Sequence, residues 1–197
     1  MASTPRIPRA ELTGIYGAVV QRMARKMLGD VPESIEVIWH NPKVRTFSLT
    51  LSRKVLKWDQ CDEGLKSLAH MAVASFVGCS FCLDLGYFQA KHRCIETAKA
   101  PEVPRWRAAT VFTDLERDVM EYAEAMTQTT PTVTGELSDR LLEALGPAAR
   151  VELAAFVGLT DFMTRAYVAY GVKSQGLAAA CGLEPLPTPS AELRPTA

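Results

Sequence analysis

Apolar residues return every three or four positions along most of this chain, and that spacing predicts amphipathic helices. Residues 12–27 form the first such segment, and Gly29 follows it as a C-cap. A second helix can start at Pro32 and is broken by Asn41-Pro42. Residues 43–58 again show helical spacing, although the threonines among them add some strand propensity.

The middle of the chain contains two predicted helices separated by one glycine. Asp62 is a suitable N-cap for a helix that runs to about residue 76. Gly78 interrupts the pattern, and a second helical segment covers residues 79–99. A loop with two prolines follows over residues 100–104.

Three further helices are predicted in the C-terminal half. The first is capped by Thr113 or Asp114, and its apolar stripe consists of Leu115, Val119, Tyr122 and Met126. Thr134 caps the second, which Gly146-Pro147 ends. Residues 148–179 predict one long helix that is apolar over much of its circumference and hence largely buried.

These segments predict an all-α fold class with one domain. The sequence contains no convincing alternating strand and no glycine-rich phosphate loop. We expect an irregular N-terminal arm over residues 1–10, a single helical domain over residues 11–180, and a disordered, proline-rich tail over residues 184–197. A chain of 197 residues is long enough to bury a sizeable core in one domain.

Composition and charge narrow the possible partners. A hydrophobic fraction of 48% and a charged fraction of 22% are ordinary for a globular protein, and the formal net charge is zero. A zero net charge argues against nucleic-acid binding, which normally requires a basic patch or stripe. No apolar run is long enough to span a membrane, and the N-terminal sequence lacks the apolar core of a signal peptide, so we expect a cytoplasmic protein.

Cys79 and Cys82 stand three positions apart in the stretch VGCSFCLDLG. On a helix this spacing puts both side chains on one face, so their sulfur atoms can meet. In a cytoplasmic protein such a pair is more typical of redox chemistry or metal binding than of a structural disulfide. Three interpretations stand side by side: a redox pair, two core thiols, or half of a zinc site, for which His92 and Cys94 are the further ligands nearby.

The redox interpretation has a clear chemical basis. A helix that starts after Gly78 places Cys79 in the first turn, where unpaired N–H groups and the helix dipole favour a thiolate. A thiolate can reduce a hydroperoxide and become a sulfenic acid, which a neighbouring thiol then condenses to a disulfide.

The segment LKSLAHMAVASFVGCSFCLDLGYFQAKH resembles the alkylhydroperoxidase D-like / carboxymuconolactone decarboxylase family, in which a helix leads through an apolar run to a Gly-Cys-x-x-Cys. Further motifs in family order extend the resemblance over roughly residues 40–180: Glu116-Arg117, Tyr122–Thr127, Val151-Glu152-Leu153, and Asp161 with Arg165. The resemblance implies an oligomeric helical bundle, a homotrimer or homohexamer, with the thiol pair in a pocket near a subunit interface.

The resemblance also implies roles for the two thiols. In the peroxidase branch of the family the second cysteine attacks the peroxide and the first resolves the product, so Cys82 is the expected peroxidatic residue and Cys79 the resolving one. The helix-dipole argument alone favours Cys79 as the more acidic thiol, but a dipole contributes only about 0.3–1 kcal/mol and other groups can override it. The expected partners are a hydroperoxide and a thiol reductant.

This sequence departs from the peroxidase branch at its proton relay. The branch carries a Glu twelve residues before the first cysteine and a His four residues after the second, and the matching positions here are Ser67 and Gly86. His70 lies one turn after Ser67 on the same helix face and is our candidate for a substitute base. A structural, hydrogen-bonded histidine is the alternative interpretation of His70.

The leading hypothesis is therefore a thiol-dependent oxidoreductase that reduces organic hydroperoxides through Cys79 and Cys82. One alternative is a divergent family member that binds an apolar ligand or a partner. Another is a cofactor-free lyase of the carboxymuconolactone decarboxylase type, acting on a small lactone acid. The sequence shows no metal, haem, flavin or nucleotide motif, so no cofactor is expected.

Overall fold

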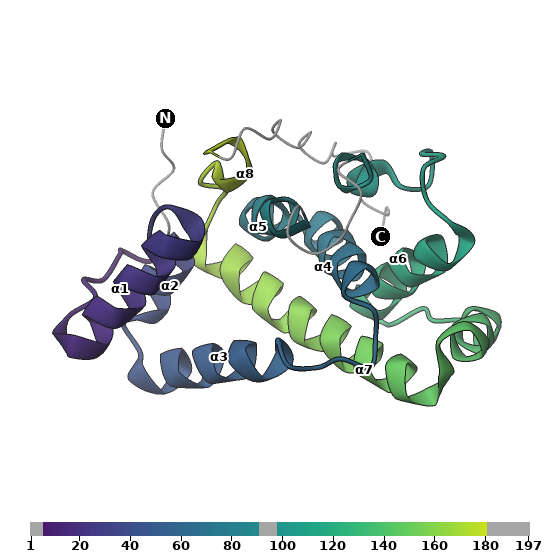
Figure 1. The fold of residues 1–197 in the computed structure, drawn as a ribbon, viewed down its shortest axis with the longest axis horizontal. Coiled ribbons are helices and arrows are strands. Elements are labelled where there is room, and N and C mark those ends of the chain that lie inside the picture. The colour runs from purple at the N-terminus through teal and green to yellow at the C-terminus, as the bar shows by residue number, and fades with distance from the viewer. Residues whose placement is uncertain (1–5, 91–97, 181–197) are drawn as a thin grey trace.

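The computed structural model describes residues 6–90 and 98–180, and within these ranges it contains helices and no β-strand (Figure 1). The elements are α1 (Gly14–Leu28), α2 (Glu33–Ile38), α3 (Pro42–Val55), α4 (Glu63–Val77), α5 (Ser80–Ala90), the 3₁₀ helix η1 (Ala100–Arg105), α6 (Asp114–Thr127), α7 (Gly135–Tyr170) and α8 (Leu177–Ala180). The predicted all-α fold class is confirmed.

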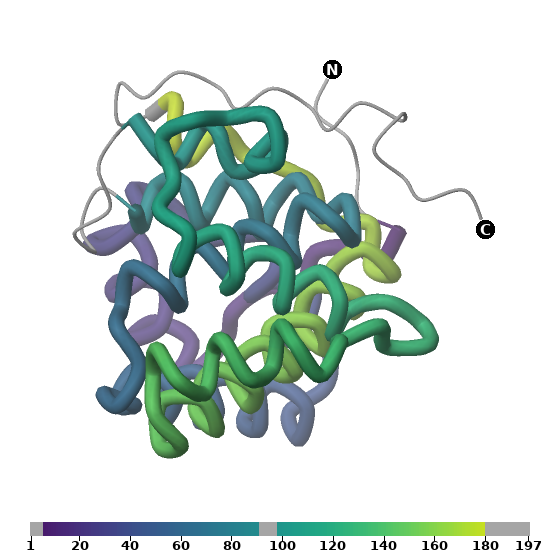
Figure 2. Tube along the Cα trace, turned by 90° about the vertical axis from the view of Figure 1, so that its right-hand side faces the viewer, coloured from purple at the N-terminus to yellow at the C-terminus, as the bar shows by residue number. Residues whose placement is uncertain are grey.

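Helix α4 lies at the centre of the core and packs against α5, α6, α7 and η1. Its hydrophobic residues from Leu68 to Ala74 are at most 1% exposed, which explains why the sequence of this helix is apolar on nearly every face. In the view turned by 90° (Figure 2), α6 and the start of α7 face the viewer and the N-terminal helices lie behind. Helices α1 and α2 have a small apolar cluster of their own, made by Leu12, Val20, Ala24, Val31 and Trp39.

Helix ends follow the local chemistry of the sequence. The Asp62 side chain accepts a hydrogen bond from the Leu65 N–H and so begins α4. Thr113 and Glu116 form a complete capping box at the start of α6. Gly78 ends α4 in the left-handed conformation, with φ 80° and ψ 30°, which a glycine adopts without steric cost. These three predicted boundaries are confirmed.

The prediction of one buried helix over residues 148–179 is wrong in two respects. The helix ends at Tyr170, because Gly171 takes a left-handed conformation (φ 76°, ψ 19°) and caps it, and residues 177–180 form the separate α8. One side of the helix is also open: Val151 is 70% and Phe162 51% exposed. At its other end, the predicted break is present as a kink inside α7, where Gly146 has φ 74° and ψ 168°.

Some sequence predictions fall on segments outside the described residues. These are residues 1–5 of the N-terminal arm, residues 91–97 of the predicted 79–99 helix, and the C-terminal tail. Cys94 and His92, the further zinc-ligand candidates, lie there too. Among the described helices, none combines the length and apolarity needed to cross a membrane.

Candidate functional site

The chain reverses direction between α4 and α5, and the two cysteines lie at this turn. The left-handed Gly78 directs the chain away from α4, and the Cys79 N–H still donates to the Ala74 carbonyl at 2.9 Å. Helix α5 starts immediately afterwards, with its Leu83 N–H donating to the Cys79 carbonyl. The Cα atoms of Cys79 and Cys82 are 5.3 Å apart, and their sulfur atoms form a disulfide.

The two sulfur atoms have different surroundings. The Sγ atom of Cys79 accepts a hydrogen bond from the Cys82 N–H at 3.2 Å, in the position that a Ser or Asp side chain takes when it caps a helix. Cys82 lines a cavity, whereas Cys79 is 1% exposed and does not contribute to the wall of that cavity. A molecule that enters the cavity therefore meets Cys82, and Cys79 lies behind it.

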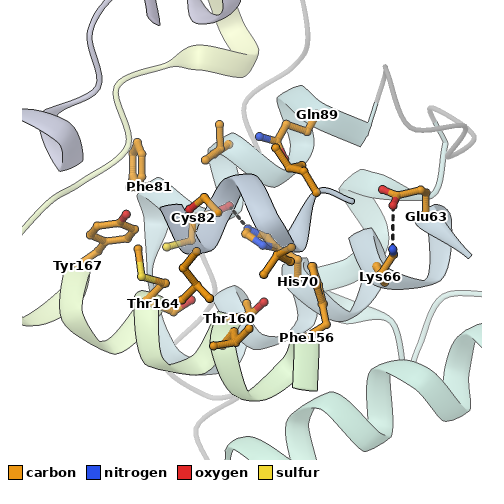
Figure 3. Close-up of a pocket in the computed structure, with 17 residues that line it drawn as sticks. Glu63, Lys66, His70, Phe81, Cys82, Gln89, Phe156, Thr160, Thr164 and Tyr167 are labelled. Carbon is orange, nitrogen blue, oxygen red and sulfur yellow. Dashed lines mark hydrogen bonds and ion pairs between the residues drawn. The ribbon is translucent and has the colours of Figure 1, made fainter. Parts of the chain in front are cut away.

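The cavity has a volume of about 240 Å³ and lies between α3, α4, α5 and α7 (Figure 3). Most of its wall is apolar, and this part consists of Leu51, Val55, Leu56, Phe81, Leu85, Phe156, Leu159, Met163 and Tyr167. Thr160 and Thr164 of α7 add two hydroxyl groups to the wall. Such a cavity, apolar with a few polar groups, is typical of a small-molecule site.

His70 lies in the cavity wall next to the peptide of Cys82 (Figure 3). Its Nε2 atom is 3.0 Å from the Cys82 carbonyl oxygen. Because a carbonyl oxygen only accepts, Nε2 carries the proton in this hydrogen bond, and Nδ1 is the atom of a neutral ring that can take up a proton. The structure thus brings all three sequence candidates, Cys79, Cys82 and His70, to one place.

Gly86 explains why this imidazole can lie so close to α5. A Cβ atom built on Gly86 would be 2.7 Å from Met71 Cγ and 3.1 Å from His70 Cδ2. A Cβ at position 86 would therefore force the Met71 side chain to move and the His70 ring to shift by a few tenths of an ångström. The histidine that the peroxidase branch carries on the second helix is absent here, and the ring of a histidine on the first helix lies beside that position.

Ser67, the other departure from the relay, does not line the cavity. It is buried, and its hydroxyl makes no hydrogen bond within the described part of the chain. Ser67 therefore does not replace the missing glutamate as a proton acceptor.

A buried lysine forms the charged end of the cavity, and this group was missed from the sequence. Lys66 Nζ donates to the Trp58 carbonyl at 2.6 Å and pairs with Glu63 at 2.8 Å and with Glu152 at 2.9 Å. Glu63, Lys66 and His70 recur at i, i+3 and i+7 on α4, and this spacing was the available signal for a shared face. Glu152 is distant in sequence and gives no such signal.

Charge pairing decides the protonation of Lys66 and Glu152. Burial alone lowers the pKa of Lys66, but the hydrogen bonds and charges of Glu63 and Glu152 outweigh it and raise the pKa above its ordinary value. Burial raises the pKa of Glu152, but Lys66 and the N–H groups of Gln60 and Cys61 outweigh burial and leave the pKa below its ordinary value. Lys66 and Glu152 are therefore both charged at neutral pH.

Two further buried residues, Asp84 and Cys61, have structural roles. The Asp84 carboxylate accepts hydrogen bonds from the Leu177 and Ala178 N–H groups and so holds the start of α8. Cys61 is a buried free thiol, and burial raises its pKa to about 11, so it is not an activated nucleophile. The described residues contain no cluster of three acidic, His or Cys side chains that could hold a metal ion.

Comparisons with solved structures place the fold. The debrominase Bmp8 superposes with a TM-score of 0.73 at 18% identity, covering 91% of this chain and 96% of that one. A peroxidase-related protein from Silicibacter sp. TM1040 gives a TM-score of 0.73 at 15% identity over 87% of this chain and 94% of its own. An alkylhydroperoxidase AhpD core protein from Ralstonia eutropha JMP134 gives a TM-score of 0.70 at 17% identity, covering 89% of this chain and 94% of its own. At these identities the similarity establishes the shared helical fold.

Sequence comparisons find a relative and a family match that each cover part of the chain. The uncharacterized protein YnjA of Escherichia coli (strain K12) is 34% identical over 116 residues, which are 59% of this chain and 64% of that protein's length, so the match spans somewhat less than two thirds of either. The model of the carboxymuconolactone decarboxylase family matches residues 42–125, which include α3, α4, both cysteines and His70. The segment that holds the thiol pair and His70 is therefore similar to the carboxymuconolactone decarboxylase family, and the fold is that of the alkylhydroperoxidase D-like structures.

Proposed function

We propose that the protein is a thiol-dependent oxidoreductase that reduces an organic hydroperoxide with the Cys79/Cys82 pair. The observation that carries the proposal is the asymmetry of the pair: Cys82 lines the cavity next to His70, and Cys79 lies behind it within disulfide-bonding distance. A nucleophile at the substrate and a resolving thiol behind it are what a two-cysteine peroxidase needs.

The first step is attack on the peroxide. In the reduced protein, His70 takes the thiol proton of Cys82, directly or through one water molecule. The Cys82 thiolate then attacks the terminal peroxide oxygen, the O–O bond breaks, and Cys82 becomes a sulfenic acid. The alkoxide that leaves takes the proton held by His70 and departs as an alcohol.

The second step closes the disulfide. The Cys79 sulfur attacks the Cys82 sulfur, and the sulfenic oxygen leaves with two protons as water. The Cys82 N–H that already points at the Cys79 sulfur stabilises its thiolate form for this attack. Two electrons and two protons from a thiol reductant then restore both thiols, and the reductant leaves as a disulfide.

The test is hydroperoxide consumption by the purified protein with a dithiol reductant. Wild type should turn over cumene hydroperoxide, Cys82→Ser should lose turnover entirely, and His70→Ala should lose about 10²–10⁴-fold, the usual contribution of a general base. If Cys82→Ser and wild type consume hydroperoxide at the same background rate, the peroxidase proposal is wrong.

A second candidate function is the reductive removal of a halogen, in which the two thiols again supply two electrons to the substrate. The apolar cavity wall beside Cys82 also suits a halogenated aromatic ring, and the fold is shared with a debrominase. In such a reaction one carbon–halogen bond is replaced by a carbon–hydrogen bond, halide and a proton are released, and the two thiols become the disulfide. Bromide release from a bromopyrrole, without turnover of any hydroperoxide, would favour this function over the first.

A further inference from the structure

The cavity offers a substrate much apolar surface and few charges. Apart from His70, the charged side chains among its described lining residues are Glu63 and Lys66. Tyr167 stays a neutral phenol, because burial raises its pKa to about 12. The threonine hydroxyls of α7 are neutral as well, so, His70 aside, the charged groups of the cavity lie at the end formed by Glu63 and Lys66.

Lys66 cannot serve as an anion receptor in its present arrangement. An ammonium group has three N–H donors, and here three acceptors take them: the Trp58 carbonyl, the Glu63 carboxylate and the Glu152 carboxylate. The Lys66 side chain is 2% exposed and that of its partner Glu152 is 9% exposed, so Lys66 cannot turn away from Glu152 without leaving a buried carboxylate uncompensated. A substrate carboxylate at this end of the cavity would lose its water and find no free N–H group on Lys66 in return.

We infer that the site selects neutral, compact, apolar substrates and discriminates against substrates that carry a carboxylate. This inference rests on the proposed function and adds the substrate class to it. The apolar wall on α3 and α7, from Leu51 and Val55 to Phe156, Leu159 and Met163, provides the favourable contact, because burial of apolar surface stabilises a bound apolar group. Hydrogen peroxide would leave this surface uncovered, and an acid would find every N–H group of Lys66 already taken.

The experiment compares two hydroperoxides of equal size that differ in charge: the 4-carboxamide and the 4-carboxylate of cumene hydroperoxide, assayed at pH 7.5 with a dithiol reductant. We expect kcat/KM for the carboxamide to exceed that for the carboxylate by at least tenfold. Equal values, or a preference for the carboxylate, would overturn the inference while the peroxidase proposal stands.

A variant assigns the discrimination to the charged cluster. Glu63 is half-exposed on its side-chain surface, so Glu63→Gln should fold, and it removes one negative charge beside Lys66. We expect this variant to lower the ratio of kcat/KM for the carboxamide to kcat/KM for the carboxylate by about fivefold. This is the size of effect expected for charges several Å apart in a partly solvated site. Glu143→Gln is the same change at an exposed position of α7 before its kink at Gly146, and it should leave this ratio unchanged. An unchanged ratio in Glu63→Gln would overturn the assignment to this cluster.

A binding measurement keeps the inference separate from the reaction. The two product alcohols, carrying the carboxamide or the carboxylate, are titrated into the protein by calorimetry. Tighter binding of the carboxamide alcohol by tenfold or more supports the inference even if neither hydroperoxide is reduced, in which case only the peroxidase proposal fails. Equal binding, or tighter binding of the carboxylate, overturns the inference.

Discussion

Replacing Gly86 with alanine should harm both packing and catalysis, although glycine-to-alanine changes inside helices normally stabilise. The new Cβ would be 2.7 Å from Met71 Cγ and 3.1 Å from His70 Cδ2, and Met71 is completely buried. Overpacking of this kind lowers the free energy of unfolding by about 1–3 kcal/mol. Replacing a helical glycine with alanine raises it by about 0.5–1 kcal/mol, because alanine loses less conformational entropy on folding. We therefore expect the free energy of unfolding to fall by up to about 2 kcal/mol.

The same substitution should displace the His70 ring. The ring must move by a few tenths of an ångström, and its hydrogen bond to the Cys82 carbonyl, now 3.0 Å, must lengthen or break. A misplacement of about 1 Å can cost about 10²-fold in rate, so a smaller shift should lower kcat by about tenfold. Urea denaturation measures the stability change, and hydroperoxide turnover measures the rate.

Gly158→Ala is the matched control for this prediction. Gly158 lies in α7 and is exposed, and no atom lies within 4 Å of the position that an alanine Cβ would take there. The change should therefore stabilise the fold by about 0.5–1 kcal/mol and leave kcat unchanged. If Gly86→Ala is as stable and as active as Gly158→Ala, the close packing between position 86 and His70 does not control the site, and the reasoning fails.

Further substitutions test the pair and the charged cluster. In Cys79→Ser, Cys82 should react with one peroxide and stop as a sulfenic acid, which mass spectrometry detects after dimedone labelling. Turnover of this variant at the wild-type rate would contradict the roles assigned to the two cysteines. Lys66→Met should lower the free energy of unfolding by about 3–5 kcal/mol in urea, because it leaves the Glu152 carboxylate buried and unpaired. Because the pKa of Glu152 is lower in the folded than in the unfolded protein, its ionised carboxylate stabilises the fold at pH values above the unfolded-state pKa. This stabilisation should be lost as the pH falls through the folded-state pKa. Glu152→Gln should therefore flatten that part of a curve of unfolding free energy against pH. Light scattering should give the mass of a homotrimer or homohexamer, and a monomer would contradict that expectation.

The parts of the fold that the sequence predicted correctly depend on near neighbours in the chain. A cap needs only residues within one turn, so Asp62, Thr113 and Gly78 could be identified from spacing alone. The long C-terminal helix was overextended because further apolar residues, Val172 and Leu177 to Ala180, follow Gly171. The conformation of that glycine, and not the apolar pattern, ends the helix.

The parts of the site that the sequence did not predict depend on distant segments. The Cys-x-x-Cys motif located the thiol pair, but the cavity wall combines α3 with α7, which lies far along the chain. The pairing of Lys66 with Glu152 joins positions 86 residues apart and has no local signature. Whether His70 faces Cys82 depended on how α4 and α5 pack, which the single-helix pattern does not specify.

The placement of Cys82 in the wall, with Cys79 behind it, has a consequence for steady-state kinetics. Within the described part of the chain, Cys82 lines the cavity and Cys79 does not. If the proposed function holds, a reducing thiol must therefore enter by the cavity that the oxidant uses, attack Cys82 and release Cys79. Oxidant and reductant would then bind in alternation to two forms of the protein, which is a ping-pong scheme with parallel double-reciprocal lines. Each would also compete with the other for one entrance, so an excess of either should slow turnover.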